Sequence, residues 1–403
     1  MTDVGDRIER PSDPRVVVRP RTELPLSVRP PGVRTVGVEE ELLVIDPRDG
    51  RPLPLADALL QQGSVPIAAR RHLTGEPSRP PLDTELQQEQ VETASLPHTD
   101  LHALRADLHR LRMSADAAAR SVGARVAAIA TSPLPVTPQM TRTSRYLTMR
   151  EEFGITCAEQ LTCGCHVHVA VASDEEGVAV LDRIRAWLPV LVAIASNSPY
   201  WKGVDTGYAG YRTQAWSRWP GTGPTDVLGS AAAYHDLVRQ MLATGSLLDE
   251  GMVYFDARLS RRYPTVEVRV ADVCTDVEDA VLVAALCRAL VDTAAAEWRA
   301  GVPPAAVATP VLRLATWRAS RSGLDGELVD PVSFERLPAR DVVESLVDHV
   351  RPALVAVGDL RRVEAGVQRV LARGSGARRQ RQVMAVAGRL AWAVLDAADR
   401  TLE

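Results

Sequence analysis

The stretch CGCHVHVAV, residues 163–171, decides the fold, because it carries two cysteines and two histidines within six positions. Sulfur and imidazole ligands at such close spacing are typical of a zinc site. In an extended strand, however, neighbouring side chains point to opposite faces, so Cys163 and Cys165 share one face and His166 and His168 the other. We therefore predict a strand with small buried cysteines on an apolar face and histidines on a polar face. A zinc site here would need a bulge or a loop.

A second stretch, VGVEEELLV at residues 36–44, shows the same division of faces. Glu39 and Glu41 share one face of the predicted strand, whereas Glu40 falls on the other face among valines and leucines. This strand therefore presents carboxylates on one side and places a single acid among apolar side chains on the other.

Two more segments extend the pattern. TVEVRVAD, residues 265–272, is the clearest alternating strand in the chain, with Glu267 and Arg269 on one face and three valines on the other. LQQEQVET, residues 86–93, is predicted to be a strand with Gln88, Gln90 and Glu92 at every second position. One further acid, Glu85, lies just upstream. The sequence thus predicts several strands that each carry acids on one face.

Crowded acids on one surface are costly unless something offsets their charge. If Glu39, Glu41, Glu92 and Glu267 lie together, each like-charged pair about 4 Å apart costs on the order of 4 kcal/mol at an effective dielectric of about 20. Such a cluster persists only with cations bound or protons taken up. Carboxylate oxygens with one imidazole suit Mg²⁺ or Mn²⁺ better than zinc. The alternative is a solvated sheet face, which is common in antiparallel sheets, and periodicity alone leaves both interpretations open.

The rest of the chain predicts a mixed α+β fold. Residues 1–33 are rich in Pro and Arg without a sustained period, which is typical of a disordered tail. Apolar residues recur at helical spacing after Asp100 and after Asp276. The other expected elements are strands at 124–135 and 161–172, a helix at 174–196, irregular substrate loops at 197–260, and helices from about 340 onward with a break at 373–381. Because the strands are amphipathic and alternate with helices, we predict a largely antiparallel sheet.

Composition excludes several classes of protein. The net charge of −4 and the pI of about 6.1 do not suit a nucleic acid or an anionic membrane surface as partner. The only lysine is Lys202, so no Walker A loop can be written, and no G-x-G-x-x-G follows a strand-like run. Five cysteines without disulfide-type spacing, and the lack of an apolar stretch of about 18 residues, predict a cytoplasmic protein with reduced thiols and no membrane span.

At these residues the chain resembles the carboxylate-amine ligase family often called glutamate-cysteine ligase type 2. The resemblance rests on the order of its motifs, from GVEEELLVID and QVET through RYL, CGCHVHVAV and NSPYWKGVDTGYAGYRT to YFDARLSRRYPTVEVRVAD, WRASRSGLDGELVD and GSGARRQR. It implies one ligase domain over residues 34–403 with a glutamine synthetase-like fold. In that fold a curved, largely antiparallel sheet holds ATP and divalent metal ions on its polar face, and helices pack on the other face. Relatives of this kind also suggest a homodimer.

The resemblance implies roles for particular residues. The implied metal ligands are Glu39, Glu41, Glu85, Glu92, His166 and Glu267. The implied catalytic residues are Glu267 and Arg269, of which Arg269 resembles the arginine beside the transferred phosphoryl group. Our candidates for binding substrate or ATP are His168, Arg212, Arg258 and Arg261. For the three arginines, a structural salt bridge is an equally good interpretation.

The implied reaction is ATP-dependent amide formation with Mg²⁺ or Mn²⁺ as cofactor. A substrate carboxylate attacks the γ-phosphate, an acyl phosphate forms, and an amine displaces phosphate. The family's name points to glutamate and cysteine as the small-molecule substrates. Ser132 stands where a histidine is expected and Ala315 where an asparagine is expected, which bears on substrate identity. The alternatives are a phosphotransferase with the same metal and ATP site, and a ligand-binding protein on a non-catalytic ligase scaffold.

Overall fold

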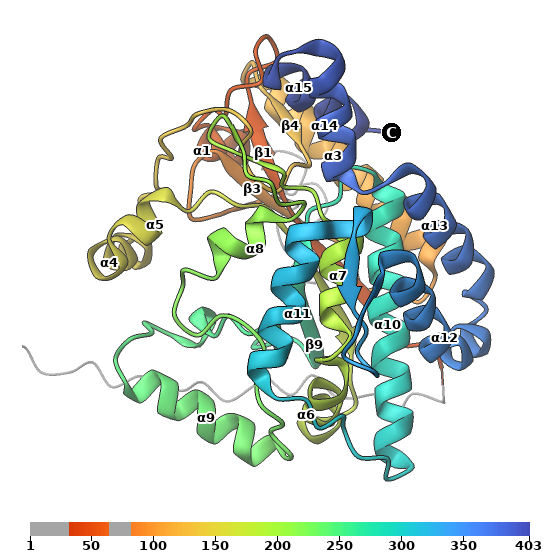
Figure 1. Ribbon diagram of the computed structural model, residues 1–403. Coiled ribbons are helices and arrows are strands. Elements are labelled where there is room, and N and C mark those ends of the chain that lie inside the picture. Colours follow the sequence, from red (N-terminus) through yellow and green to blue (C-terminus); the bar gives the residue numbers. More distant parts are fainter. Residues whose placement is uncertain (1–31, 64–81) are drawn as a thin grey trace, which may run out of the picture. The chain divides into compact units, whose positions relative to one another are not determined.

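An antiparallel sheet lies at the centre of the fold (Figure 1). The computed structural model describes residues 32–63 and 82–403. The predicted tail at 1–33 therefore lies outside the described residues except for its last two, and it stays a prediction. The order of strands across the sheet is β2 (Asp83–Thr84), β3 (Gln90–Ala94), β1 (Val36–Ile45), β5 (Gly164–Ala170), β9 (Thr265–Asp272) and β8 (Ala257–Leu259). Neighbouring strands are antiparallel, and β4 (Arg125–Ala127) also pairs with β1.

Apolar side chains cover one face of this sheet and pack against helices. Valines at alternating positions of the central strands have at most 1% of their surface exposed: Val36, Val38, Val167, Val169, Val266 and Val268. Helices α3 (Leu101–Ser121) and α10 (Val277–Arg299) pack on β1, and α6 (Asp174–Ile184) packs on β8 and β9. Full burial of each such side chain contributes about 1.5–3 kcal/mol, so the alternation of valines fixes which face meets the helices.

Further helices extend this layer. In Figure 1 the helices α12 (Ala339–Val357) and α13 (Leu360–Arg373) lie beside α10, while α14 (Gly376–Ala387) packs on α15 (Leu390–Arg400). The remaining helices of the described residues are α1 (Ala56–Gly63), α4 (Ser144–Phe153), α5 (Ile155–Glu159), α7 (Leu188–Ala195), α8 (Tyr211–Trp216), α9 (Ala231–Ala243) and α11 (Thr309–Ser322). Two 3₁₀ turns and two small hairpins complete these elements: η1 (Glu250–Met252), η2 (Gly323–Asp325), β6–β7 (Tyr200–Trp201 and Val204–Asp205) and β10–β11 (Glu327–Val329 and Arg336–Pro338).

The two long predicted helices begin at the predicted residues. The side chain of Asp100 accepts a hydrogen bond from His102 N at 2.8 Å, and that of Asp276 accepts one from Glu278 N at 2.9 Å. These bonds satisfy backbone N–H groups that the first turn of a helix leaves without partners. The N-cap residues Asp100 and Asp276 therefore correctly predicted where these two helices begin.

Two predicted elements end earlier than expected. The helix predicted at 174–196 is wrong as one element, because α6 ends at Ile184 and a new helix, α7, starts at Leu188 with Pro189 in its first turn. A proline there has no N–H to continue the preceding helix. The strand predicted at 124–135 is wrong beyond Ala127, where pairing with β1 stops.

Three other boundaries differ from the prediction. The strand predicted at 86–93 begins only at Gln90, because the residues before it form turns and a single bridge. The region 197–260, predicted to be irregular, contains helix α9, which Ser230 caps through its hydroxyl at 3.2 Å from Ala233 N. The break predicted at 373–381 is short, since α14 starts inside it.

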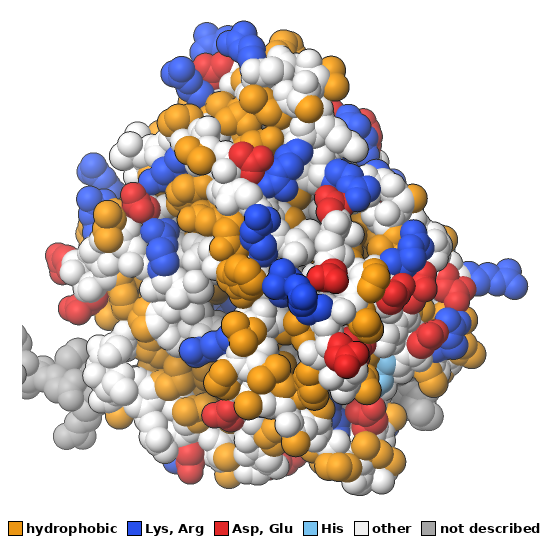
Figure 2. Space-filling view, viewed as in Figure 1, with side chains coloured by type: hydrophobic (Ala, Val, Ile, Leu, Met, Phe, Trp, Pro, Cys, Tyr) orange, Lys and Arg blue, Asp and Glu red, His pale blue; other side chains and the backbone are white. Residues whose placement is uncertain are grey.

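The surface visible in Figure 2 carries mixed charge. Basic side chains (blue) and acidic side chains (red) are interspersed on this face, which presents no continuous basic surface of the kind that follows a nucleic acid backbone. Among the residues that the structure describes, no helix is both long and apolar enough to cross a bilayer.

Candidate active site

Strand register gathers the predicted site residues on the sheet face opposite α3 and α10. It does so in cross-strand pairs, which are Glu41 with Glu92, Glu39 with His166, and His168 with Glu267. Residues directly opposite each other on antiparallel strands have Cβ atoms about 4.5–5.5 Å apart. Side chains from distant parts of the chain therefore meet on one surface, which we call the polar face.

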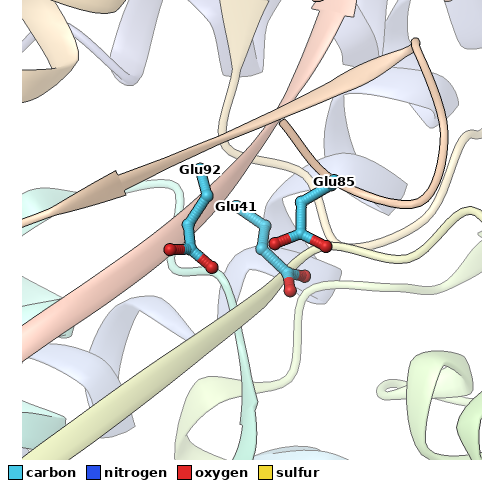
Figure 3. Close-up of side chains that lie close together, drawn as sticks. All are labelled: Glu41, Glu85 and Glu92. Carbon is cyan, nitrogen blue, oxygen red and sulfur yellow. The ribbon is translucent and has the colours of Figure 1, made fainter. Parts of the chain in front are cut away.

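Three acids form a carboxylate cluster on the polar face (Figure 3). One carboxylate oxygen each of Glu41, Glu85 and Glu92 lies within 4.8 Å of the others, and Figure 3 shows the three side chains converging from β1, β3 and the turn after β2. Burial and the charge of Glu41 raise the pKa of Glu85 to about 8. A proton or a cation offsets this crowding, and three carboxylates suit a hard divalent ion such as Mg²⁺ or Mn²⁺.

Glu39 lies between the two histidines of β5. Its Oε2 is 3.9 Å from His166 Nδ1 and 3.5 Å from His168 Nε2. Burial alone would raise the pKa of Glu39, but the two imidazoles lower it well below its usual range. Burial and the nearby Arg269 lower the pKa of His166, which favours the neutral imidazole that metal coordination requires. The chemistry of Glu39 and His166 therefore fits their predicted role as metal ligands.

His168 is placed differently from its neighbour. Its Nδ1 lies 3.1 Å from Thr265 Oγ1, and its ring meets that of Tyr263 edge-on. Burial would lower the pKa of His168, but the carboxylates of Glu39 and Glu267 raise it above its ordinary value. A protonated imidazole is a donor, so this histidine suits an anion better than a metal ion.

Glu267 is held by two guanidinium groups. Arg258 Nε and Nη2 donate to its carboxylate at 2.9 and 3.2 Å, and Arg269 Nη1 donates to Oε1. Burial would raise the pKa of Glu267, but the two arginines lower it below its usual range. Both of its oxygens already have partners, so a metal ion at Glu267 would share them with the arginines. Arg258 thus has the structural salt bridge that we considered for it.

Arg212 and Arg269 flank one tryptophan on the polar face. The guanidinium carbon of Arg212 lies 5.8 Å from the ring centre of Trp216, and that of Arg269 lies 5.9 Å from it. The Nε atoms of Arg212 and Arg269 are buried without a hydrogen-bond partner. On the polar face these two N–H groups are donors that an anionic ligand can use.

Arg261 is not part of this group. Its Nη1 lies 3.9 Å from Asp249 Oδ1, and half of its side chain is exposed. Asp249 also accepts hydrogen bonds from Arg145 at 2.7 and 3.1 Å. Arg261 therefore belongs to an ion-pair group that links α4 to η1, outside the carboxylate cluster.

The cysteines stay out of the site, as the alternation predicts. Cys163 and Cys165 are at most 1% exposed, and burial raises the pKa of both thiols well above the ordinary value. Within the described ranges, the close group of three or more metal-ligating side chains is the carboxylate cluster, and it contains no sulfur. The zinc interpretation of CGCHVHVAV is therefore not supported.

One residue of the polar face was missed in the sequence. In a regular strand Asp272 would share a face with Val266, Val268 and Val270. The register of β9 against β5 shifts between Cys165 and Val167, so Arg269 and Val270 together oppose His166. This bulge turns Asp272, opposite Gly164, onto the polar face. The signal for it in the sequence was that Asp272, an acid, occupies a position that the alternation assigns to the apolar face.

The two residues that depart from the family pattern, Ser132 and Ala315, are both buried. Ser132 is buried, and its hydroxyl donates to the backbone oxygen of Leu134 at 2.7 Å. Ala315 is buried in α11. Neither residue contributes to the carboxylate cluster, so the departures leave the predicted metal ligands unchanged.

A sheet face with acids suited to divalent cations, and buried guanidinium groups suited to anions, is typical of metal-dependent enzymes that bind phosphates or carboxylates. The family of glutamate-cysteine ligases called family 2 (GCS2) matches residues 35–395, so the chain belongs to this family. A Streptomyces coelicolor relative named "Putative glutamate--cysteine ligase 2" is 52% identical over 92% of this chain and 99% of its own length. A Paenarthrobacter aurescens relative named "Putative glutamate--cysteine ligase 2-1" is 53% identical over 87% of this chain and 90% of its own.

Solved structures support the fold. A Francisella tularensis glutamate–cysteine ligase in complex with AMP superposes with a TM-score of 0.64 at 13% identity, over 92% of this chain and 88% of that one. A bifunctional glutathione synthetase from Pasteurella multocida gives 0.66 at 12% identity, over 92% of this chain and 52% of that one. At such identities the likeness concerns the fold alone, and it confirms the predicted α+β class with a glutamine synthetase-like antiparallel sheet.

Proposed function

We propose that the protein is an ATP-dependent ligase that forms an amide between the carboxylate of glutamate and the amine of a second substrate, cysteine. Family membership supports amide-forming ligase chemistry, and the names of the relatives support these two substrates. The observation that carries the proposal is the cluster of Glu41, Glu85 and Glu92 on the same face as two guanidinium groups with unpaired donors.

The first step transfers the γ-phosphoryl group of ATP to the substrate carboxylate. A carboxylate oxygen attacks phosphorus, the bond to the β-phosphate oxygen breaks with its electron pair going to ADP, and an acyl phosphate results. Charge spreads over the transferred phosphoryl oxygens, and in this proposal the Arg269 guanidinium stabilises it. Glu41, Glu85 and Glu92, with Glu39 and His166, are the residues that would hold divalent cations, which neutralise phosphate charge when bound.

The second step forms the amide. The amine nitrogen attacks the acyl carbon, the bond from that carbon to phosphate oxygen breaks, and the nitrogen's proton leaves with the released phosphate. In the described part of the chain all five cysteines are buried, so the protein offers no thiolate on the polar face. In the proposed reaction the substrate carboxylate itself is the nucleophile of the first step, and positioning and charge stabilisation carry the catalysis.

The test uses a matched pair of buried acids. In Glu92→Gln we expect ADP release with glutamate and cysteine to fall by at least about 10²-fold, because a ligand of the carboxylate cluster is lost. Glu89→Gln is the control, since Glu89 is also buried and its carboxylate accepts hydrogen bonds from Gln139 N at 3.0 Å, outside the carboxylate cluster. The control should keep its turnover, with the amide identified by mass spectrometry.

The outcome also separates the alternatives. Glu92→Gln with full ADP and amide formation would show that the cluster is not the active site. A stable phosphorylated product without amide would favour a phosphotransferase. Tight binding of ATP and glutamate in calorimetry without any turnover would favour a ligand-binding protein.

A further inference from the structure

Asp272 is a buried acid whose place in the proposed reaction is unassigned. It lies at the end of β9 with 3% of its surface exposed, and the bulge at Arg269 and Val270 brings it onto the polar face. A carboxylate buried to this degree needs hydrogen bonds or a counter-charge. The partners of Asp272 therefore indicate what it does.

Asp272 has both hydrogen bonds and a nearby counter-charge, and a different carboxylate oxygen takes part in each. Asp272 Oδ2 accepts hydrogen bonds from Asn197 N at 2.8 Å and from Ser198 Oγ at 2.7 Å. Asp272 Oδ1 lies 4.0 Å from Arg212 Nη1. The hydroxyl of Ser198 in turn accepts a hydrogen bond from Arg212 N at 2.9 Å. Asp272 thus acts on Arg212 at two points, through Ser198 on its backbone and by charge on its guanidinium.

Arg212 is a buried cation with unused donors. It is 3% exposed, Nη2 donates to the backbone oxygen of Arg269 at 3.4 Å, and Nε has no partner. A distance of 4.0 Å to Asp272 is too long for a hydrogen bond but close enough for charge compensation. The carboxylate therefore makes burial of this guanidinium tolerable without occupying the N–H groups that a ligand would use.

The guanidinium lies directly beside the carboxylate cluster. A Cβ atom built on Gly164 would come within 2.3 Å of Arg212 Nη2, so the arginine lies against the backbone of β5 at this residue. The N–H of Gly164 donates to Glu41 Oε2 at 2.6 Å. Arg212 and Glu41 therefore both contact the backbone of β5 at Gly164, which places the guanidinium near an acid of the carboxylate cluster.

We propose that Asp272 is a positioning residue that holds Arg212 so that its free N–H groups bind an anionic oxygen of the substrates, either of the transferred phosphoryl group or of the substrate carboxylate. The inference rests on the proposed ligase function. Asp272 itself does not touch substrate, and its effect passes through Arg212.

A double-mutant cycle tests this coupling. In Asp272→Asn the hydrogen-bonding oxygen is kept and the charge is lost, so we expect kcat/KM to fall by up to about 10²-fold as the guanidinium shifts. Arg212→Met should lower kcat/KM at least as much, and Asp272→Asn should then cost nothing further in that background. Ser198→Ala, which removes the link to the Arg212 backbone, should give a smaller loss of the same kind. A loss in kcat alone assigns the phosphoryl group, and a raised KM for glutamate assigns the carboxylate.

A matched control separates positioning from folding. Asp182 is equally buried and accepts hydrogen bonds from the backbone N–H groups of Leu228 and Gly229 at 2.7 and 2.8 Å, away from the polar face. Asp182→Asn should lower thermal stability and leave kcat/KM unchanged. Equal activity of Asp272→Asn and the parent, or losses that add in the double variant, would overturn the proposal.

Binding measurements keep the inference separate from the reaction. If the parent protein forms no amide, the proposed function fails, and calorimetric titration with ATP plus Mg²⁺ and with glutamate then decides about Asp272. Weaker binding of one of the two ligands, to the same extent in Asp272→Asn, Arg212→Met and the double variant, supports the positioning role. Unchanged affinity for both ligands contradicts it.

Discussion

Glu40 and Glu41 are neighbours in β1, but they face opposite surroundings. Glu40 is fully buried on the helix side, where Arg112 donates to it at 2.8 Å from Nε and at 2.5 Å from Nη2. The same guanidinium also donates to the backbone oxygens of Cys274 and Thr275. Glu41 lies on the polar face, where its neighbours are two further carboxylates. Glu40 is therefore matched by a cation within the fold, whereas Glu41 lies in a cluster of carboxylates.

This difference separates structural from ligand-binding acids. A matched buried pair strongly destabilises the protein when one partner is removed, because the other charge is left uncompensated. A crowded carboxylate has the opposite effect, since removing it relieves repulsion at the expense of a ligand site. Removing the cation that pairs with Glu40 should therefore destabilise the protein, whereas removing a clustered carboxylate should stabilise it. Three variants of graded effect compare the two faces.

The largest effect is expected on the helix side. Arg112→Met should lower the free energy of unfolding by about 3–5 kcal/mol, because Glu40 is left buried without its partner. Chemical denaturation measures the change. Arg105→Met on the same helix is the control, since its ion pair with Glu278 at 2.8 Å is one-third exposed and should contribute at most about 1 kcal/mol. Equal losses in the two variants would contradict the comparison.

A smaller effect of the opposite sign is expected for Glu85→Gln. The pKa of Glu85 is raised from its ordinary 4.5 to about 8, so between these values the folded protein holds a proton that the unfolded chain releases. The free energy of unfolding therefore falls as the pH rises through this window, and Glu85→Gln lacks this part of the fall.

Denaturation in the presence of a chelator should then find Glu85→Gln more stable than the parent at about pH 6, by on the order of 2 kcal/mol. Added Mg²⁺ should stabilise the parent and not the variant, since a ligand of the folded state shifts the equilibrium by mass action. A parent that is unchanged by Mg²⁺ and equal to the variant at every pH would argue against a cation site here.

The sequence predicts the faces of the strands better than it predicts their neighbours. Alternation is local, so the opposite placement of Glu40 and Glu41 follows from β1 alone. The meeting of Glu41 with Glu92 depends on pairing between strands far apart in the chain, and only the family resemblance supplied it. Asp272 was missed because a bulge is a property of two paired strands, and one strand read alone does not reveal it. The same limit explains Arg261, which lies three residues after Arg258 in one motif but pairs with Asp249 and not with Glu267.

The smallest effect on stability, with a large effect on activity, is expected for Gly164→Ala on the polar face. The added Cβ would meet the guanidinium of Arg212, with Nη2 at 2.3 Å, and would lie 3.0 Å from His166 Nε2. Because the guanidinium is the far end of a flexible side chain it can move away, so stability should change by no more than about 1 kcal/mol. The displaced guanidinium should lower kcat/KM by up to about 10²-fold. Gly37→Ala is the control. It also adds a Cβ to the polar face, from β1, and no other atom lies nearer to that Cβ than 3.9 Å. If Gly164→Ala is as active as Gly37→Ala, the location of Arg212 does not matter to the reaction, and the polar face binds its anions elsewhere.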